Sequence, residues 1–203
     1  AVPFGGIYRI IDVTLSNCIN SNLRRIFVLT QYKALSLNRH VREGWSSLMG
    51  LGEYIEILTP QMRVSANWYL GTADAVYQNI YSIGSERSTY AIILSGDHIY
   101  KMDYGKMLQQ HVDADADVTV ATTEMDRAEA AGRFGIIETD AQWRVLGFQE
   151  KPADPKPSCQ HPGKVNASMG VYIFSTQFLI PILIADAENP QSSHDFGKDI
   201  LPR

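Results

Sequence analysis

Residues 94–103 read LSGDHIYKMD and follow the apolar run YAIIL, so a carboxylate and an imidazole come directly after a buried strand. Open α/β folds bind their ligands at the carboxyl ends of sheet strands. Gly96 lets a ligand approach the backbone, and the Asp97 carboxylate suits Mg²⁺, which completes its shell with waters and phosphate oxygens. A turn aspartate explains Asp97 equally well, and His98 is more typical of a hydrogen-bonded packing residue.

Two other segments carry residues suited to phosphate and sugar binding. In QEKP at 149–152, Lys151 could pair with a phosphate and Glu150 could hydrogen bond to sugar hydroxyls, although a solvated Glu–Lys pair before a proline turn is the simpler interpretation. In WYLGTAD at 68–74, aromatic residues and a glycine precede a helix, whose N-terminus offers backbone groups to anions or to a base. An aromatic pair at this place is also typical of core packing.

Two motif-like patterns are rejected. Asp113 to Asp117 with Glu124 imitate a calcium loop, but Val118 occupies the position that needs glycine and the following VTVAT is strongly β-forming. Ser192, His194 and Asp195 match a hydrolase triad by residue type only, because triad members must converge from separate segments.

The elements that must position these residues alternate along the chain. Strands are expected at 25–30, 90–96, 117–125 and 166–175, and a hairpin over 134–152 with its turn at 140–142. Helices are expected at 10–22, 33–45, 72–83, 103–114 and from 175 or 176 to 187, with Thr72 and Asp103 as N-caps and Pro181 as a kink or delayed start. This order predicts one α/β domain with a Rossmann-like, mostly parallel mixed sheet flanked by helices.

Composition excludes several classes of protein. The 203 residues carry a net charge of −4, which gives no electrostatic case for nucleic acid or an anionic membrane. No apolar run approaches the ~20 residues of a membrane helix. The two cysteines, Cys18 and Cys159, have neither disulfide nor metal spacing. We therefore expect a protein of the reducing cytoplasm, with no membrane or nucleic-acid partner.

Seven motifs in this order resemble the bacterial glucose-1-phosphate adenylyltransferase family, also called ADP-glucose pyrophosphorylases. They are RIIDVTLSNCINSNLRRIFVLTQYK, NWYLGTADAVYQN, ILSGDHIYKMDYGKML, GRFGII, FQEKPADP, NASMGVYIF and SSHDFGKDILP. The resemblance implies the nucleotide-diphospho-sugar transferase fold and transfer of AMP from ATP to α-D-glucose 1-phosphate, giving ADP-glucose and pyrophosphate for glycogen or starch synthesis.

The resemblance also implies a role for each matching residue. Asp97 would hold Mg²⁺ and Lys151 would bind the phosphate of glucose 1-phosphate. The residues implied for the sugar-phosphate site, besides Lys151, are Tyr69, Gly135, Glu150, Ser168 and Asp195. Gly71 and Thr72 would line the adenine, and Arg9 matches a residue of the allosteric AMP-type site. Attack by an ionised sugar phosphate needs no general base, so catalysis would consist of positioning and charge neutralisation.

The family pattern extends past both ends of residues 1–203. Its glycine-rich G-G-x-G-x-R-L loop, its first strand and its C-terminal β-helix domain are not in this sequence, which predicts part of a catalytic domain, inactive by itself, from a parent homotetramer. Two alternatives stay open. One is a non-catalytic regulatory subunit, against which Asp97 and Lys151 argue, and the other is a nucleotidyltransferase that uses UTP or dTTP.

Overall fold

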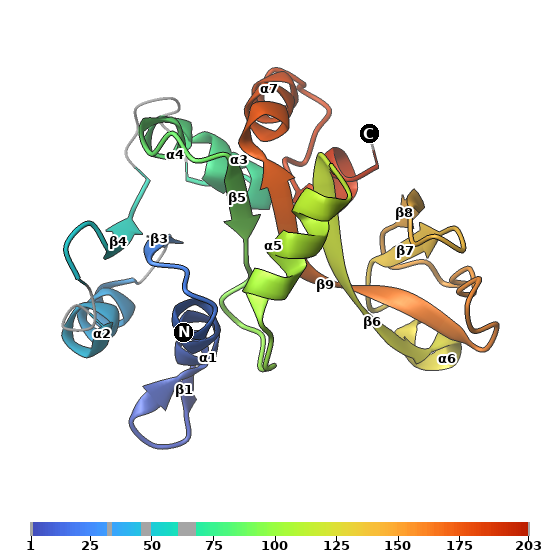
Figure 1. The fold of residues 1–203 in the computed structure, drawn as a ribbon, viewed down its shortest axis with the longest axis horizontal. Helices are drawn as coiled ribbons and strands as arrows, with labels where there is room; N and C mark the ends of the chain where they lie inside the picture. Colours follow the sequence, from blue (N-terminus) through green and yellow to red (C-terminus); the bar gives the residue numbers. More distant parts are fainter. Residues whose placement is uncertain (1, 32–33, 46–49, 61–67, 203) are drawn as a thin grey trace.

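The computed structural model describes residues 2–31, 34–45, 50–60 and 68–202 (Figure 1). Its strands are β1 (Pro3–Phe4), β2 (Tyr8–Arg9), β3 (Arg25–Leu29), β4 (Tyr54–Leu58), β5 (Tyr90–Ile93), β6 (Val118–Asp126), β7 (Ile136–Thr139), β8 (Val145–Gln149) and β9 (Lys164–Ser175). Its helices are α1 (Ile10–Asn20), α2 (Leu35–Trp45), α3 (Thr72–Tyr77), α4 (Ile80–Ser85), α5 (Tyr104–Asp113), α6 (Arg127–Ala130), α7 (Thr176–Ala187) and the π-helix η2 (Phe196–Ile200).

The strands form three sheets. β1 and β2 make a short antiparallel hairpin, and β3 pairs with β4 in parallel. A five-stranded antiparallel sheet has the order β5-β9-β7-β8, with β6 also paired to β9. In Figure 1 the β3–β4 pair and α2 lie to one side of the central β5–β9–β6 sheet, and β7, β8 and α6 lie to the other. The mixed α/β class is thus confirmed. The described strands pair mostly antiparallel, however, and not mostly parallel as predicted, since β3–β4 is the single parallel pair among them.

The twelve-residue strand β9 organises the large sheet. β6 follows one edge of β9 along most of its length, whereas β5 and β7 share the opposite edge. β5 ends its pairing at Tyr172, and β7 begins its own at Ala167. Residues 168–171 therefore lie between the end of β5 and the start of β7. Of these residues, Ser168 still donates its backbone N–H to the Gly135 carbonyl, directly before β7.

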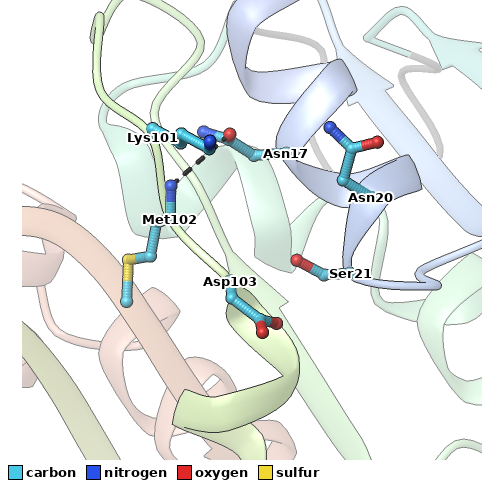
Figure 2. A pocket seen from close by; sticks show the side chains of 6 residues that line it. All are labelled: Asn17, Asn20, Ser21, Lys101, Met102 and Asp103. Carbon is cyan, nitrogen blue, oxygen red and sulfur yellow. Dashed lines mark hydrogen bonds between the residues drawn. The ribbon is translucent and has the colours of Figure 1, made fainter.

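Helix α1 connects the N-terminal part to this sheet. The Thr14 hydroxyl donates to the carbonyl of Ser95 at 3.2 Å, and the Asn17 amide donates to the carbonyl of Tyr100 at 2.9 Å. Figure 2 shows a cavity of about 340 Å³ between the C-terminal end of α1 and the start of α5; its lining residues are Asn17, Asn20, Ser21, Lys101, Met102 and Asp103. None of the predicted site residues lines this cavity.

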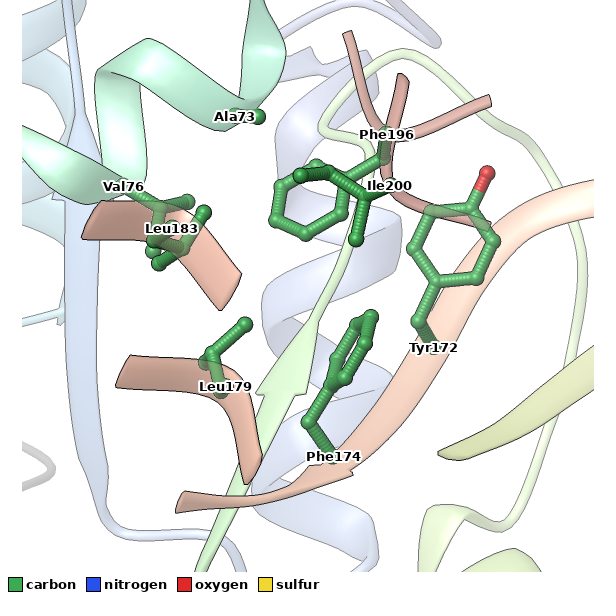
Figure 3. Packing of buried hydrophobic residues seen from close by; sticks show 8 residues of the cluster. All are labelled: Ala73, Val76, Tyr172, Phe174, Leu179, Leu183, Phe196 and Ile200. Atoms are coloured by element: carbon green, nitrogen blue, oxygen red, sulfur yellow. The ribbon is translucent and has the colours of Figure 1, made fainter. Parts of the chain in front are cut away.

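Both faces of β9 are buried because its side chains alternate between two apolar clusters. Tyr172 and Phe174 pack with α3, α7 and η2 (Figure 3); the buried residues of this cluster are Ala73, Val76, Tyr172, Phe174, Leu179, Leu183, Phe196 and Ile200. Val171 and Ile173 face the other way, against Tyr104 and Met107 of α5. The end of β5, the start of α3 and η2 are thereby held around one strand.

The sequence predicted several elements correctly and missed others. The hairpin with its turn after Thr139 is confirmed, as is the cap of α5, where the Asp103 carboxylate accepts from Gly105 N–H at 2.9 Å. α7 starts after Ser175, as predicted, but Pro181 does not delay that start, since the helix begins at Thr176 and runs through Pro181. Strand β4 and the β1–β2 hairpin were not predicted.

The predicted helix 72–83 is wrong as a single element, since α3 ends at Tyr77 and α4 begins at Ile80. The Asn79 side-chain amide donates to the carbonyl of Ala75 at 2.8 Å, while its backbone N–H bonds to Val76. This side chain competes for a helical carbonyl and interrupts the regular pattern. Thr72 is the first residue of α3 rather than its cap, which is Gly71.

No helix of the described ranges is long and apolar enough to cross a membrane.

Candidate active site

The Asp97 loop, residues 94–100, follows β5 and carries an exposed carboxylate. The Asp97 side chain is 80% exposed, and it accepts a hydrogen bond from the Ser95 hydroxyl. His98 Nε2 lies 3.8 Å from Asp97 Oδ1, and the His98 ring packs edge-on against Tyr100. A single carboxylate of this kind suits a hard cation that takes its other ligands from phosphates and water. Within residues 2–31, 34–45, 50–60 and 68–202, no three His, Cys, Asp or Glu side chains form a group able to hold a metal.

The Asp97 loop adjoins β9 at Gly170. Gly170 has a φ of +66°, in the left-handed region, and a methyl group on it would lie 3.6 Å from the His98 ring. Gly170 N–H donates to the Ser168 hydroxyl at 3.3 Å. The stretch of β9 between its pairings with β5 and β7 thus faces the Asp97 loop with a residue that has no side chain.

A second group, the Tyr172 cluster, is formed by residues from separate segments: Gly135, Glu150, Ser168, Tyr172 and Asp195. Ser168 N–H donates to the Gly135 carbonyl at 2.8 Å, and the Tyr172 hydroxyl lies near the Ser168 side chain. Burial, together with the nearby Asp195 and Glu150 carboxylates, raises the pKa of Tyr172, so this phenol stays protonated. The structure thus brings together four of the predicted sugar-phosphate residues.

Glycines close the Tyr172 cluster tightly. A methyl group on Gly135 would lie 2.5 Å from Phe148 Cζ and 3.3 Å from Glu150 Oε2. A methyl group on Gly197 would lie 3.1 Å from the same Glu150 oxygen and 3.2 Å from Asp195 Oδ1. Any side chain at Gly135 would therefore have to displace the phenylalanine ring.

Lys151 extends from this cluster towards solvent. Its Nζ lies 3.3 Å from Glu150 Oε1, and its side chain is 59% exposed. The backbone of Lys151 has a φ of +46°, which is uncommon for a residue with a side chain. A cation placed beside a carboxylate at the rim leaves its remaining donors available to an anionic ligand.

Asp195 connects the Tyr172 cluster to the start of α3. The Thr72 hydroxyl donates to Asp195 Oδ2 at 3.0 Å and accepts from Phe196 N–H at 3.1 Å. Asp195 Oδ1 accepts from Gly197 N–H at 2.9 Å and caps η2. Gly71 packs directly on the next chain segment, since a methyl group on it would lie 2.2 Å from the His194 carbonyl oxygen. Gly71 and Thr72 are therefore in contact with the segment that carries Asp195, and through it with the Tyr172 cluster.

The other two predicted residues lie in different surroundings. The Tyr69 hydroxyl accepts from the Asn79 amide at 3.0 Å, and burial raises the pKa of Tyr69. Arg9 lies at the start of α1, where its guanidinium donates to the Ser36 hydroxyl at 3.3 Å. Neither residue has a hydrogen bond to the Tyr172 cluster among those that the described residues form.

The sequence reasoning did not single out Tyr172. A usable signal was present, because Ser168, Gly170 and Tyr172 alternate along one strand and so lie on one face of it. In Figure 3 the Tyr172 hydroxyl points away from the apolar cluster that its ring completes. In sequence, Tyr172 has the pattern of a core tyrosine, and only the nearby Glu150 and Asp195 carboxylates mark it as a site residue.

The structure confirms that the two rejected patterns form neither a calcium loop nor a catalytic triad. Asp113 ends α5 and Val118 begins β6, so this segment cannot wrap a calcium ion. Ser192 and His194 both bind the carboxylate of Asp186, at 2.8 Å and 2.9 Å, and the serine hydroxyl donates to that carboxylate rather than to the imidazole.

Comparison with known proteins places this geometry in context. The family model described as "Nucleotidyl transferase" matches residues 1–203. The chain is 64% identical over 206 residues to the glucose-1-phosphate adenylyltransferase of Koribacter versatilis, covering 100% of this chain and 49% of that protein. It is 56% identical to the enzyme of the same name from Teredinibacter turnerae and 53% identical to that of Hydrogenovibrio crunogenus, again over the whole chain and 48% of each relative. The chain thus spans about half the length of the curated relatives that it matches.

Proposed function

Since the chain belongs to the nucleotidyl transferase family, we propose that the protein containing it transfers AMP from ATP to α-D-glucose 1-phosphate. The products are ADP-glucose and pyrophosphate. The observation that carries this proposal is the Tyr172 cluster, in which Gly135, Glu150, Ser168 and Asp195 come together from distant segments around one buried phenol. Sequence similarity to three named glucose-1-phosphate adenylyltransferases supports the same substrates.

The sugar phosphate is assigned to the Tyr172 cluster. Lys151 would pair with its phosphate as a mobile point charge. The carboxylates of Glu150 and Asp195 would accept hydrogen bonds from sugar hydroxyls, since an ionised carboxylate only accepts. Gly135 leaves room beside Glu150 because it has no side chain. The Tyr69 ring would line the same sugar-phosphate site.

The nucleotide is assigned to the segment before α3. Gly71 and Thr72 would offer their backbone to the adenine, and the hydrogen bond between Thr72 and Asp195 would keep this segment beside the sugar phosphate. Arg9 is kept as a proposed part of an allosteric site, separate from both substrates.

The reaction requires little covalent work from the protein. An oxygen of the ionised sugar phosphate forms a bond to the α-phosphorus of ATP, and the bond from that phosphorus to the bridging β-oxygen breaks, so pyrophosphate leaves with that oxygen. Catalysis then rests on holding the two phosphates in line and on neutralising their charge. Asp97 would hold a divalent cation, proposed as Mg²⁺, which supplies part of that neutralisation.

The remaining proposals concern the whole protein. We propose a homotetramer located in the cytoplasm, with ATP and glucose 1-phosphate as its small-molecule partners. The net charge of −4 of this chain argues against a nucleic-acid partner. Size-exclusion chromatography with light scattering tests the tetramer, and fractionation of cells tests the compartment.

The activity is tested by a coupled pyrophosphate-release assay on the purified full-length protein with Mg²⁺ and glucose 1-phosphate. ATP should support turnover, whereas UTP and dTTP should support less than a tenth of that rate. Equal or faster turnover with UTP or dTTP would assign the protein to another sugar nucleotide. No turnover with any nucleotide, despite binding of glucose 1-phosphate, would favour a regulatory subunit.

A further inference from the structure

Asp186, in the last turn of α7, is buried and anchors a chain segment that the proposed mechanism does not use. Its side chain is 2% exposed. Its Oδ1 accepts from the Ser192 hydroxyl at 2.8 Å, and its Oδ2 lies 2.9 Å from His194 Nδ1. Burying a carboxylate is costly unless strong hydrogen bonds compensate, so this contact constrains Ser192 and His194.

His194 has an unusual backbone conformation. Its φ is +56°, in the left-handed region that residues with a side chain rarely adopt. Its N–H donates to the Ser192 hydroxyl at 2.9 Å, so the serine accepts from His194 and donates to Asp186. The imidazole is only 13% exposed. Two side-chain contacts to Asp186 therefore support a backbone turn that would otherwise be disfavoured.

This turn aims the His194 carbonyl at the first turn of α3. The carbonyl oxygen accepts from Ala73 N–H at 2.8 Å. The same oxygen is the nearest atom to the position that a Gly71 methyl group would occupy, at 2.2 Å. The next residue, Asp195, accepts from Thr72. Consecutive residues thus both bind the start of α3, His194 through its carbonyl and Asp195 through its carboxylate. Since Asp195 also belongs to the Tyr172 cluster, this pair of residues connects that cluster to the segment proposed for the nucleotide.

We propose that Asp186 and His194 are positioning residues that fix the separation between the two substrate sides. By holding His194 in the left-handed conformation, the pair sets where Asp195 and the segment of Gly71 and Thr72 meet. The assignment of these two sides to the nucleotide and the sugar phosphate rests on the proposed function. The positioning of Asp195 and the Gly71 segment by Asp186 and His194 does not depend on that assignment. Asp199 holds the opposite side of the turn, since it accepts from Asp195 N–H at 3.0 Å and from the Ser193 hydroxyl at 2.8 Å.

Three substitutions at His194 separate the side-chain pair from the backbone conformation. His194→Asn keeps an N–H donor at the place of Nδ1, because both atoms are two bonds from Cβ, and asparagine tolerates a positive φ. His194→Gly removes the donor but relieves the backbone. His194→Ala removes the donor and keeps the disfavoured conformation. Each is made in the full-length protein.

The first measurement does not depend on activity. Hydrogen exchange of the Ala73 amide reports the bond to the His194 carbonyl. Exchange should be faster in His194→Gly and His194→Ala and close to wild type in His194→Asn. His161→Ala is the matched control, because His161 also contacts a carboxylate, at 2.5 Å from Glu124, but is 63% exposed; it should leave exchange at Ala73 unchanged.

The second measurement is steady-state kinetics with both substrates varied. His194→Gly and His194→Ala should lower kcat/KM by about 10²-fold, the size expected when reacting groups are displaced by about 1 Å. The KM values for ATP and glucose 1-phosphate should rise together, because both sides move. His194→Asn should restore wild-type values within about threefold, a margin well below that expected loss.

Two results would overturn the proposal. Wild-type behaviour of His194→Gly in exchange and kinetics would mean that the pair with Asp186 positions nothing. An effect of His194→Asn as large as that of His194→Ala would exclude the Asp186 contact as its cause. If the glycine and alanine variants do not fold, Ser192→Ala removes one hydroxyl without changing the backbone and should give the same faster exchange at Ala73; unchanged exchange would count against the proposal. A wild-type protein that binds no nucleotide would refute the proposed function and leave the exchange result to decide on positioning.

Discussion

The Asp97 loop and the Tyr172 cluster differ in how much of their arrangement exists before any substrate binds. The Tyr172 cluster is closely packed, since a methyl group on Gly135 would meet Phe148 and one on Gly197 would meet Glu150, and Tyr172 itself is buried. The Asp97 carboxylate is 80% exposed, with the Ser95 hydroxyl as its donor. A preformed cluster suits recognition of a rigid sugar, whereas an exposed carboxylate suits a cation that arrives with the nucleotide phosphates.

The largest expected effect is that of Asp97→Asn on turnover. We expect kcat to fall about 10³-fold, because the substitution removes stabilisation felt mainly in the transition state. The KM values and the melting temperature should change little, since the side chain is exposed. Steady-state kinetics and thermal unfolding of the full-length protein measure both.

Asp154→Asn is the matched control for this prediction. Asp154 is 88% exposed and pairs with Arg127 at 2.6 Å. It should keep wild-type kcat. If the Asp97→Asn variant kept more than a tenth of wild-type kcat, the Asp97 loop would not contribute to catalysis as proposed.

Gly71→Ala tests the tightly packed side. The added methyl group would meet the His194 and Ser193 carbonyl oxygens at 2.2 Å and 2.5 Å, and backbone atoms cannot move aside cheaply. We expect a loss of about 1–3 kcal/mol in the free energy of unfolding and about a 10²-fold loss in kcat/KM. Gly163→Ala, which adds a methyl group in open space, should be neutral in urea unfolding and in kinetics. Equal effects of the two substitutions would mean that close packing at Gly71 is unimportant.

Lys151→Ala should separate the two substrates. It removes one charge-assisted contact, so the KM for glucose 1-phosphate should rise about 10- to 100-fold while the KM for ATP changes little. Lys156→Ala is the control, because Lys156 also pairs with a glutamate, Glu138, and is 62% exposed. If Lys151→Ala raised both KM values equally, Lys151 would not bind glucose 1-phosphate specifically.

The smallest expected effect is the pH dependence of folding stability that arises from His111, a residue of α5 packed against β9. His111 is buried beside Thr119 and Ser175, and burial lowers its pKa below the usual 6.5 although Asp117 opposes this. The unfolded chain therefore binds the proton first, so the stability from this site is present above about pH 6.5 and is lost as the pH falls below it. Urea unfolding between pH 7.5 and 5.5 should show a decrease of at most about 1.4 kcal/mol per pH unit from this group.

His111→Asn should remove that component of the pH dependence, because asparagine does not titrate and keeps a polar atom towards Thr119. A slope identical to wild type would mean that His111 does not titrate in this range.

Much of the candidate site was predictable because its residues sit in strong local patterns. The apolar strand followed by Gly96 and Asp97 can be predicted from residue spacing alone, and so can the hairpin whose turn begins at Asp140. The prediction of Asp103 as a helix cap rested on a side chain that bonds within its own turn. Interactions over two to four residues depend on the local chain, so residue order is sufficient to predict them.

Other features depend on contacts that no local pattern contains. The Thr72 hydroxyl was expected to cap its own helix, yet Asp195, 123 residues away, accepts its hydrogen bond. Strand β4 was not recognised, since its pairing with β3 is what defines it.

The sequence by itself determined most of the strands and helices around the candidate site, because side-chain alternation and capping act over a few residues. Only the tertiary structure decided which of these residues meet. The fold brings Tyr172 near the Glu150 and Asp195 carboxylates, which raise its pKa, and it brings His194 into contact with Asp186 and Ala73. The physical reason is that a buried polar group must find partners wherever the packed chain supplies them, irrespective of their separation in sequence.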